Sequence, residues 1–251
     1  MRNLLESWDM VRLRLRNAKA IALFLDFDGT LAPLQVRPED VQLPPATRLV
    51  LRRLACRRRL RVWIISGRRQ ADVCERLSLP GVCSLGLYGW ENGSLPVDVA
   101  TLGILAEVRI ELAHRLDPAA GLWIEDKGAT FALHYRGATP AAVQLARAAL
   151  EKLQGSFSGC LSVTKGDHIW EVMPRELRGK GHAVRRYFHR FCHSALPVYI
   201  GDDAADEPAF AALSQGITAC VGPARQTRAN FRLRNPAEVR RALEKLDRET
   251  R

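Results

Sequence analysis

Apolar residues form three short, uninterrupted runs along this chain, and each run ends in polar residues. The runs cover residues 21–25, 62–65 and 196–200. Apolar runs of this length without alternation are typical of inner parallel strands, which are buried on both faces. Helices are predicted over 69–77 and over 180–188. The pattern therefore predicts an α/β fold with a Rossmann-like parallel sheet.

The middle of the chain has a different pattern, in which two helices alternate with two pairs of strands. The order αββαββ predicts a compact α+β cap inserted into the core. The predicted elements are a helix over 99–116, strands over 122–124 and 130–135, a helix over 140–153 and a hairpin of 160–164 and 168–173. We expect a core of residues 1–96 and 177–251 and a cap of residues 97–176, with hinges at Pro96 and Pro174.

The first apolar run ends in two carboxylates, Asp26 and Asp28. Ligands of open α/β sheets bind beyond the carboxyl ends of the strands, so both side chains are expected at the mouth of a site. Alternation along the chain puts them on the same side, where their repulsion calls for a cation. Mg²⁺ suits carboxylate and carbonyl ligands, Gly29 permits a sharp turn, and Thr30 adds a hydroxyl. The alternative is an aspartate-rich turn after a core strand.

The second apolar run ends in Ser66, Gly67 and Arg68, directly before a predicted helix. A small hydroxyl and exposed N–H groups at a helix start complement an anion, which predicts phosphate binding. The alternative is that Ser66 caps the helix and Arg68 is a solvated residue of its first turn. Lys180, which has glycines on both sides at the start of a later helix, is expected to add a fixed positive charge.

Four acidic residues follow the third run within six positions. They are Asp202, Asp203, Asp206 and Glu207. Such clustering costs stability unless a metal ion or a basic neighbour compensates for the repulsion. The cluster therefore favours a functional site over a purely structural turn.

Taken in order, these motifs resemble the four motifs of the haloacid dehalogenase-like phosphatases. The cap segment in turn resembles trehalose-6-phosphate phosphatases, in the stretches 124–128, 133–136 and 170–174. The resemblance extends from about Ile21 to Leu243. It implies a cap of C2B type and the hydrolysis of trehalose 6-phosphate, the last step of trehalose biosynthesis. It also implies a small-molecule sugar phosphate as partner, with a trehalose-6-phosphate synthase in the same pathway.

The resemblance also implies roles for the acidic residues. Asp26 would be the nucleophile that forms a phosphoaspartate, and Asp28 would be the acid/base. Mg²⁺ would be bound by Asp26, the main-chain carbonyl of Asp28, and Asp202. Asp203 and Asp206 would orient water or the lysine. The implied phosphate ligands are Thr30, Ser66, Gly67, Arg68 and Lys180.

Substrate selection is expected in the cap, because the core motifs recognise only a phosphate. By resemblance the sugar ligands are Glu125, Lys127, His134, Arg136 and Glu171. Carboxylates and cations suit a disaccharide, whose hydroxyls are both donors and acceptors. The alternative is a set of cross-strand ion pairs on a solvated sheet face, with a structural histidine.

One departure from the family pattern concerns the segment after the third core strand. The family usually carries Gly-x-His-Gly-x-Glu there, whereas this chain has Tyr88 in the position of the histidine, before Gly89 and Glu91. A phenol can still donate a hydrogen bond to a substrate oxygen, but it does not become cationic near neutral pH. These three residues are expected to bind substrate. The departure leaves open a sucrose-phosphate, glucosylglycerol-phosphate or mannosylglycerate-phosphate phosphatase.

Composition raises two further alternatives. The net charge of +11 and an arginine run at residues 52–61 suggest a nucleic-acid-binding protein. We expect this run to be the solvated face of the helix between the first two core strands, because it lacks interleaved aromatic residues, and we expect no nucleic-acid partner. The second alternative is an inactive sugar-phosphate sensor, which is disfavoured because all four motifs keep their chemical groups.

The remaining composition predicts a cytoplasmic, soluble protein. The N-terminal residues are too charged for a signal peptide, and no apolar stretch is long enough to cross a bilayer, so no membrane association is expected. The six cysteines include no CxxC pair, which favours buried thiols over disulfides or zinc ligands.

Overall fold

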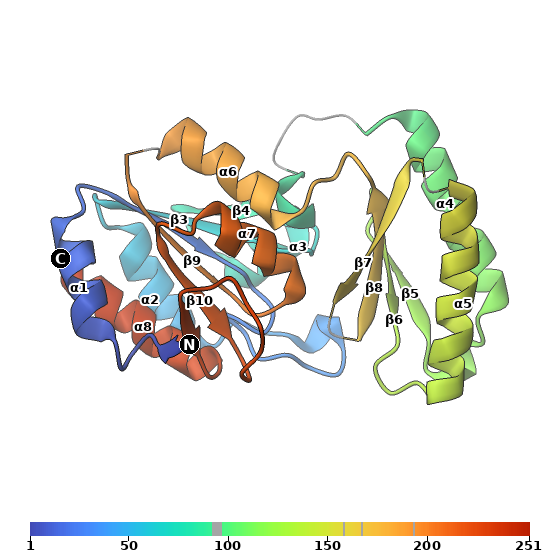
Figure 1. Ribbon diagram of the computed structural model, residues 1–251, viewed down its shortest axis with the longest axis horizontal. Helices are drawn as coiled ribbons and strands as arrows, with labels where there is room; N and C mark the ends of the chain where they lie inside the picture. The colour runs from blue at the N-terminus through green and yellow to red at the C-terminus, as the bar shows by residue number, and fades with distance from the viewer. Residues whose placement is uncertain (92–96, 158, 167, 193) are drawn as a thin grey trace. The chain divides into compact units, whose positions relative to one another are not determined.

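The computed structural model describes residues 1–251 except 92–96, 158, 167 and 193, and it leaves the side chains of residues 118 and 154 undescribed. The chain forms two compact units (Figure 1). Unit 1, the core, comprises Met1–Gly93 and Gly179–Arg251, and unit 2, the cap, comprises Ser94–Arg178. The hinge expected at Pro96 lies outside the described residues.

The core is built on a seven-stranded sheet in the order β1-β11-β10-β9-β2-β3-β4, with every pairing parallel. Its strands are β1 (Arg2–Asn3), β2 (Ile21–Leu25), β3 (Leu60–Ile65), β4 (Val82–Leu85), β9 (Leu196–Gly201), β10 (Ile217–Val221) and β11 (Phe231–Leu233). Strand β2 lies between β3 and β9, and all five of its side chains are buried, on alternating faces of the sheet. This burial on both faces explains why its sequence does not alternate. The predicted α/β class and parallel sheet are confirmed.

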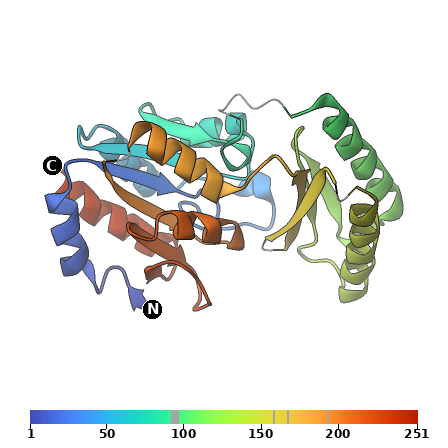
Figure 2. The same cartoon turned by 45° about the horizontal axis from the view of Figure 1, so that its top comes forward.

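Helices cover both faces of the core sheet (Figures 1 and 2). One face carries α1 (Trp8–Asn17), α2 (Pro45–Ala55), α3 (Gln70–Leu77) and α8 (Pro236–Glu249). The other face carries α6 (Lys180–Phe191) and α7 (Glu207–Ala212). Short 3-10 turns lie at η1 (Pro38–Asp40), η2 (Leu87–Gly89) and η4 (Ala204–Asp206). The core is therefore a three-layered α/β unit.

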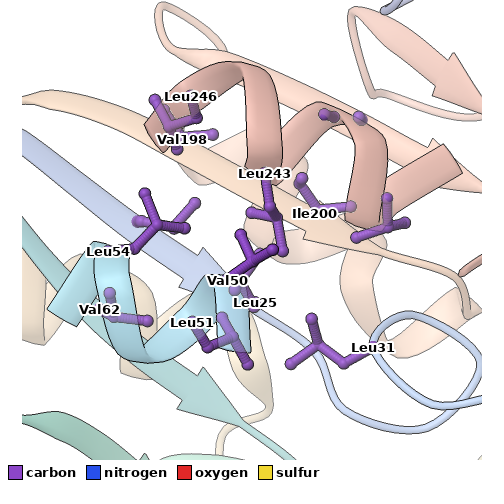
Figure 3. Close-up of a cluster of buried hydrophobic side chains, with 14 of the residues drawn as sticks. Leu25, Leu31, Val50, Leu51, Leu54, Val62, Val198, Ile200, Leu243 and Leu246 are labelled. Atoms are coloured by element: carbon purple, nitrogen blue, oxygen red, sulfur yellow. The ribbon is translucent and has the colours of Figure 1, made fainter. Parts of the chain in front are cut away.

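The larger apolar cluster of the core lies under α2 and α8 (Figure 3). Leu51 of α2 and Leu243 of α8 are fully buried there, against Leu25 of β2 and Val62 of β3. Burial of each such side chain contributes about 1.5–3 kcal/mol relative to exposure. This cluster holds the strand that precedes Asp26 in a fixed place.

The expectation that the whole arginine run lies on one helix is wrong. Helix α2 ends at Ala55, so only Arg52 and Arg53 of the run are helical. Arg57, Arg58 and Arg59 lie in the following turn, and Arg61 lies on β3. The chain leaves the helix because β3 must begin at Leu60, which pairs with Ile21 of β2.

The arginine run is also less solvated than expected. Arg53 Nε and Arg57 Nη2 donate to the carboxylate of Asp247 on α8, at 2.8 and 2.6 Å. Burial by itself would raise the pKa of Asp247, but the hydrogen bonds from both arginines outweigh it and lower the pKa. Arg59 donates to the carbonyl of Leu15 at 3.0 Å. Arginines of the run therefore link α2 and the turn that follows it to α8 and α1.

The six cysteines are all free thiols. Cys192 and Cys220 are buried, as expected, and Cys83 and Cys160 are partly buried. Cys56 and Cys74 are exposed, contrary to the expectation of buried thiols, because both lie on or at the end of helices that turn them outward.

The cap is an αββαββ unit, as predicted. Its antiparallel sheet has the order β5-β6-β8-β7. The elements are α4 (Val99–Arg115), η3 (Pro118–Ala120), β5 (Trp123–Asp126), β6 (Phe131–His134), α5 (Pro140–Phe157), β7 (Leu161–Gly166) and β8 (Ile169–Pro174). Both long helices pack on one face of the sheet through an apolar cluster that includes Leu112, Phe131 and Leu150. The predicted helix ends at Leu153, a buried apolar position, whereas α5 continues four residues further, to Phe157.

Within the described part of the chain, no helix combines the length and apolar character needed to cross a bilayer.

We expect Asp247→Asn to lower the free energy of unfolding by about 1–3 kcal/mol near neutral pH, because charge-assisted hydrogen bonds from Arg53 and Arg57 are lost. Folding lowers the pKa of Asp247, so the stabilisation that its ionised carboxylate adds to the free energy of unfolding is fully present above the unfolded pKa of about 3.9. The contribution is lost as the pH falls through the folded pKa. Urea unfolding of both proteins from about pH 7 to pH 3 should show the difference narrowing below about pH 4.

Asp9→Asn is the matched control, because Asp9 forms an exposed pair with Arg12 at 3.5 Å. Its effect should stay within about 0.5 kcal/mol. A difference between wild type and Asp247→Asn that does not change with pH would contradict the role given to the ion pair.

Candidate active site

The polar residues that end three apolar strands meet at one edge of the core sheet. Asp26 follows β2, Ser66 follows β3, and Asp202 follows β9. The parallel register pairs Leu25 with Ile64 on one side and with Ile200 on the other, so these three ends lie level. The strand geometry therefore gathers the motifs at the carboxyl edge of the sheet, where open α/β folds bind ligands.

Three carboxylates form a cluster at this edge. Asp26, Asp202 and Asp206 each have an oxygen within 4.8 Å of the others. Thr30, which is fully buried, donates its hydroxyl to Asp202 Oδ1 at 3.2 Å. Burial raises the pKa of Asp26 to about 6, against the lowering effect of Lys180. Burial and the charge of Asp26 raise the pKa of Asp202. Burial and mutual repulsion thus disfavour full ionisation of these carboxylates.

Lys180 is the basic partner of this cluster. Its Nζ lies 2.6 Å from Asp26 Oδ1 and 2.8 Å from Asp206 Oδ1, and the residue is only 3% exposed. Burial by itself would lower the pKa of Lys180, but Asp206 and Asp26 outweigh it and raise the pKa well above the usual value. The amine is therefore a permanent ammonium. Gly179 precedes it as the N-cap of α6, and the two acids compensate for a cation at a helix N-terminus, where the dipole disfavours positive charge.

Asp206 is held by residues around it. Its Oδ1 also accepts from the hydroxyl of the buried Tyr199, at 2.6 Å, and its Oδ2 accepts from the backbone N–H of Asp203 at 2.9 Å. The carboxylate of Asp203 accepts from the N–H of Ala204, and Asp203 and Asp206 together form a capping box at the start of η4. Asp203 thus shapes the turn. Tyr199 was not predicted as a site residue, because a tyrosine in an apolar run looks like a core residue.

Gly29 has no room for a side chain. A Cβ at this position would lie 2.0 Å from Asp202 Oδ2, and the backbone has φ of +72°. Both facts require glycine, because other residues avoid positive φ and would push Asp202 away. The sharp turn predicted at Gly29 therefore also brings Asp202 against the turn that follows Asp26.

Asp28 is not one of the three clustered carboxylates and is bound by Arg68. Arg68 Nε donates to Asp28 Oδ2 at 2.7 Å, and Nη2 donates to Oδ1 at 2.6 Å. Each of the two aspartates therefore has its own basic partner, Lys180 for Asp26 and Arg68 for Asp28. Arg68 is not a solvated residue of the helix, because its side chain is 10% exposed and α3 begins only at Gln70.

The loop of Ser66, Gly67 and Arg68 lies against Tyr88. A Cβ at Gly67 would come within 2.9 Å of the phenol ring, and Tyr88 N–H donates to the carbonyl of Ser66 at 2.8 Å. Ser66 is buried and its hydroxyl accepts from the N–H of Arg68 at 3.1 Å. Leu87 and Tyr88 have φ of 45° and 60°, a conformation that costs non-glycine residues energy and is frequent at functional sites. The phenol is thus fixed beside the expected phosphate loop.

Gly89 and Glu91 have structural contacts. A Cβ at Gly89 would lie 2.3 Å from the Cβ of Ala183 on α6, so this glycine permits close packing. Glu91 accepts a hydrogen bond from the N–H of Gln70, the first residue of α3, and lies 3.5 Å from Arg69. Its carboxylate therefore stabilises the positive end of that helix.

In the cap, Lys127 and Glu171 form a buried ion pair. Lys127 Nζ lies 3.2 and 3.0 Å from the two oxygens of Glu171, and Thr130 donates its hydroxyl to Glu171 Oε1 at 2.9 Å. Burial raises the pKa of Glu171, against the lowering effect of Lys127. Both residues are buried, so the alternative of solvated ion pairs does not describe them.

A second group lies on the same face of the cap sheet, opposite its helices. His134 Nε2 is 2.9 Å from Glu125 Oε2, and Lys127 Nζ is 3.8 Å from that oxygen. Trp123 stacks on the imidazole, with ring centroids 3.8 Å apart, while the residue remains 42% exposed. Trp123 was not predicted as a site residue, although its position two residues before Glu125 on one strand places both side chains on this face. Arg136 lies in the exposed turn after β6.

Comparisons with known proteins point to the same family as the sequence motifs. The chain matches the family model described as trehalose-phosphatase over residues 24–237. It is 32% identical over 250 residues to the trehalose-phosphate phosphatase of Mycobacterium tuberculosis strain H37Rv, in an alignment that covers 93% of this chain and 63% of that protein. The chain therefore spans less than two thirds of the length of this relative.

Solved structures agree on the fold. The C-terminal domain of trehalose-6-phosphate phosphatase from C. albicans is similar with a TM-score of 0.83 and 21% identity, over 95% of this chain and 96% of that one. A haloacid dehalogenase-like hydrolase from Bacteroides thetaiotaomicron gives a TM-score of 0.63 at 16% identity, over 91% of this chain and 100% of that one. The resemblance of the motifs is confirmed: the chain has a haloacid dehalogenase-like fold and belongs to the trehalose-phosphatase family.

Proposed function

We propose that this chain hydrolyses trehalose 6-phosphate to trehalose and phosphate through a phosphoaspartate at Asp26. The observation that carries the proposal is the position of Asp26, with Oδ1 2.6 Å from a buried lysine and beside Asp202 at the carboxyl edge of the sheet. A nucleophilic carboxylate, a fixed cation and an acidic cluster are the groups that phosphoryl transfer requires. Family membership supports the choice of substrate.

The proposed reaction has two displacements. In the first, a carboxylate oxygen of Asp26 bonds to phosphorus, the bond from phosphorus to the sugar oxygen breaks, and that oxygen takes a proton from Asp28. In the second, Asp28 takes a proton from water, the water oxygen bonds to phosphorus, and the bond to Asp26 breaks. Phosphate is released and both aspartates return to their starting forms.

Charge stabilisation would come from residues around Asp26. The Lys180 ammonium, the Thr30 hydroxyl and the Ser66 loop lie at the edge where the phosphoryl oxygens would be held. These groups are already fixed by burial and hydrogen bonds, so little reorganisation would be needed as charge develops.

We infer that Mg²⁺ is the cofactor. Asp26, Asp202 and the main-chain carbonyl of Asp28 would hold it, because both oxygens of Asp206 already accept hydrogen bonds from protein groups. The donor set fits the ion: the cluster has three carboxylates, of which Lys180 contacts two, and oxygen ligands of this kind suit a hard divalent cation. When bound, Mg²⁺ would neutralise charge on the phosphoryl oxygens.

The sugar would be recognised by the polar face of the cap. Glu125, Lys127 and Glu171 lie on this face with His134 and the exposed ring of Trp123. Charged groups whose positions are fixed by mutual bonds can accept and donate to several sugar hydroxyls at once. Arg136 is a further candidate from the adjoining turn. Tyr88, which replaces the histidine of the family pattern, would influence which sugar phosphate is preferred. A trehalose-6-phosphate synthase would supply the substrate proposed here.

The first prediction from the proposed function concerns the reaction itself. Among trehalose 6-phosphate, sucrose phosphate, glucosylglycerol phosphate and mannosylglycerate phosphate, we expect the fastest phosphate release from trehalose 6-phosphate, measured with Mg²⁺ present. Asp26→Asn should be less stable but still fold, because Asp206 continues to pair with Lys180. It should lose turnover by roughly 10³-fold or more, because an amide is a far weaker nucleophile. Faster phosphate release from another sugar phosphate would mean that trehalose 6-phosphate is not the preferred substrate. Appreciable turnover by Asp26→Asn would mean that Asp26 is not the nucleophile.

The second prediction concerns the metal ion. Mg²⁺ at about 100 times its Kd should add about 2.7 kcal/mol to the stability of the wild type, seen as a rise in Tm. Asp202→Asn should lose most of this rise, because one carboxylate of the cluster is removed. The exposed variant Asp9→Asn should keep it. An equal rise in wild type and Asp202→Asn would mean that the ion binds elsewhere.

The third prediction concerns the cap. Glu125→Ala should raise KM for trehalose 6-phosphate by about 10- to 100-fold, because one or two hydrogen bonds to a charged group are lost. KM for p-nitrophenyl phosphate, which has no sugar, should change little. Glu111→Ala on α4, where Glu111 forms an exposed pair with Arg115, is the control. Equal changes for both substrates would show that Glu125 has only a structural role.

A further inference from the structure

Arg68 fixes the orientation of the Asp28 carboxylate. Its two parallel bonds, 2.7 Å to Oδ2 and 2.6 Å to Oδ1, occupy both oxygens. A guanidinium bound in this way sets the plane and rotation of a carboxylate, which a single hydrogen bond or an ammonium does not. Asp28 is otherwise 29% exposed and would have several rotamers available. Arg68 therefore selects one of them.

Arg68 is itself held on several sides. Nη1 donates to Asp72 Oδ2 at 2.8 Å, and Nη2 also donates to the carbonyl of Pro38 at 2.8 Å. The guanidinium lies over the ring of Phe27, 5.8 Å from its centroid, and the side chain is only 10% exposed. Its backbone carbonyl accepts from Leu87 N–H at 2.8 Å. The group that orients Asp28 thus has little freedom of its own.

The next link is Asp72, which lies four residues further on, in the first turn of α3. Its second oxygen accepts from Arg76 Nε at 2.7 Å. Arg76 in turn donates to the carbonyls of Glu39 and Val41. Asp28, Arg68, Asp72 and Arg76 form a row of alternating charge, which lets each member be partly buried without an unpaired charge.

These contacts leave little capacity for binding a phosphate. A guanidinium has five N–H groups, and Arg68 uses four of them in the bonds to Asp28, Asp72 and Pro38. To bind a phosphoryl group in the same bidentate manner, Arg68 would have to release Asp28. The geometry therefore favours a role that differs from the phosphate binding expected from the motif.

We propose that Arg68 is a positioning residue, which holds Asp28 in the orientation needed for its proton transfers, and that Asp72 holds Arg68 in turn. The inference rests on the proposed roles of Asp28 as proton donor to the leaving oxygen and proton acceptor from water. If Arg68 acts only through Asp28, removing Arg68 should lower turnover in the wild-type background. It should have no further effect once Asp28 is replaced by a residue that cannot exchange a proton.

The test is a double-mutant cycle with Arg68→Ala, Asp28→Asn and the double variant, assayed with p-nitrophenyl phosphate in the presence of Mg²⁺. We expect Arg68→Ala to lower kcat by about 10- to 100-fold, part of the effect of a general acid/base, with KM changed less than about 3-fold. The double variant should lie within about 2-fold of Asp28→Asn, because residues that act as a unit are not additive. The substrate carries no sugar, so the cycle is readable even if the sugar proposed above is wrong.

Three companion variants separate positioning from loss of structure. Arg68→Lys keeps a positive charge without the two-point contact, so it should recover little of the lost kcat. Asp72→Asn keeps Arg68 but loosens it, and should give a smaller fall in kcat that disappears in the Asp28→Asn background. Arg52→Ala, an exposed arginine of α2, should match the wild type in kcat and Tm.

Two results would overturn the proposal. If Arg68→Ala raises KM and the inhibition constant for inorganic phosphate by about 10-fold or more while kcat is maintained, Arg68 binds the phosphoryl group. If the effects of Arg68→Ala and Asp28→Asn multiply in the double variant, Arg68 acts independently of Asp28. Should Arg68→Ala fail to fold, the Asp72→Asn and Asp28→Asn pair decides the same question.

Discussion

The core of this protein depends on one ammonium group, that of Lys180, buried between two carboxylates. Its Nζ lies 2.6 Å from Asp26 Oδ1 and 2.8 Å from Asp206 Oδ1. Removing one partner of a buried ion pair leaves an uncompensated charge and costs about 3–5 kcal/mol, so the three groups are interdependent. The same contact joins the start of α6 to the end of β2, across 154 positions of sequence. The charge proposed to support catalysis therefore also helps to assemble the fold.

The cap also contains a buried lysine that is compensated by a buried carboxylate. Lys127 and Glu171 are buried together, and Thr130 supplies a further hydrogen bond to the carboxylate. One face of the cap sheet carries the apolar cluster covered by helices, and the buried pair of Lys127 and Glu171 lies on the other face. Fully bonded polar groups in a low-dielectric setting are rigid, and a rigid arrangement discriminates better among sugar hydroxyls than mobile surface charges do.

Local signals in the sequence predicted the parts of the structure that depend on neighbouring residues. The unbroken apolar runs gave the inner strands, and the parallel register then explains why Asp26 and Asp202 meet. Contacts between distant segments could not be predicted. Nothing local shows that Arg68 would bind Asp28, since a long guanidinium can reach several acids, and the role of Tyr199 was hidden in an apolar run. The end of α2 was misjudged because it is set by the pairing of β3 with a strand far earlier in the chain.

The position of β2 in the sheet has a consequence for the order of events during protein synthesis. One neighbour, β3, follows β2 closely in the chain, but the other, β9, comes only after the whole cap segment. The cap is continuous in sequence and has an apolar cluster of its own. Until the ribosome has delivered β9, one edge of an entirely apolar strand stays unpaired, a feature that promotes aggregation. A nascent chain would thus be able to complete its cap while the carboxylate cluster still lacked two of its three members, and chaperones would be needed most in that interval.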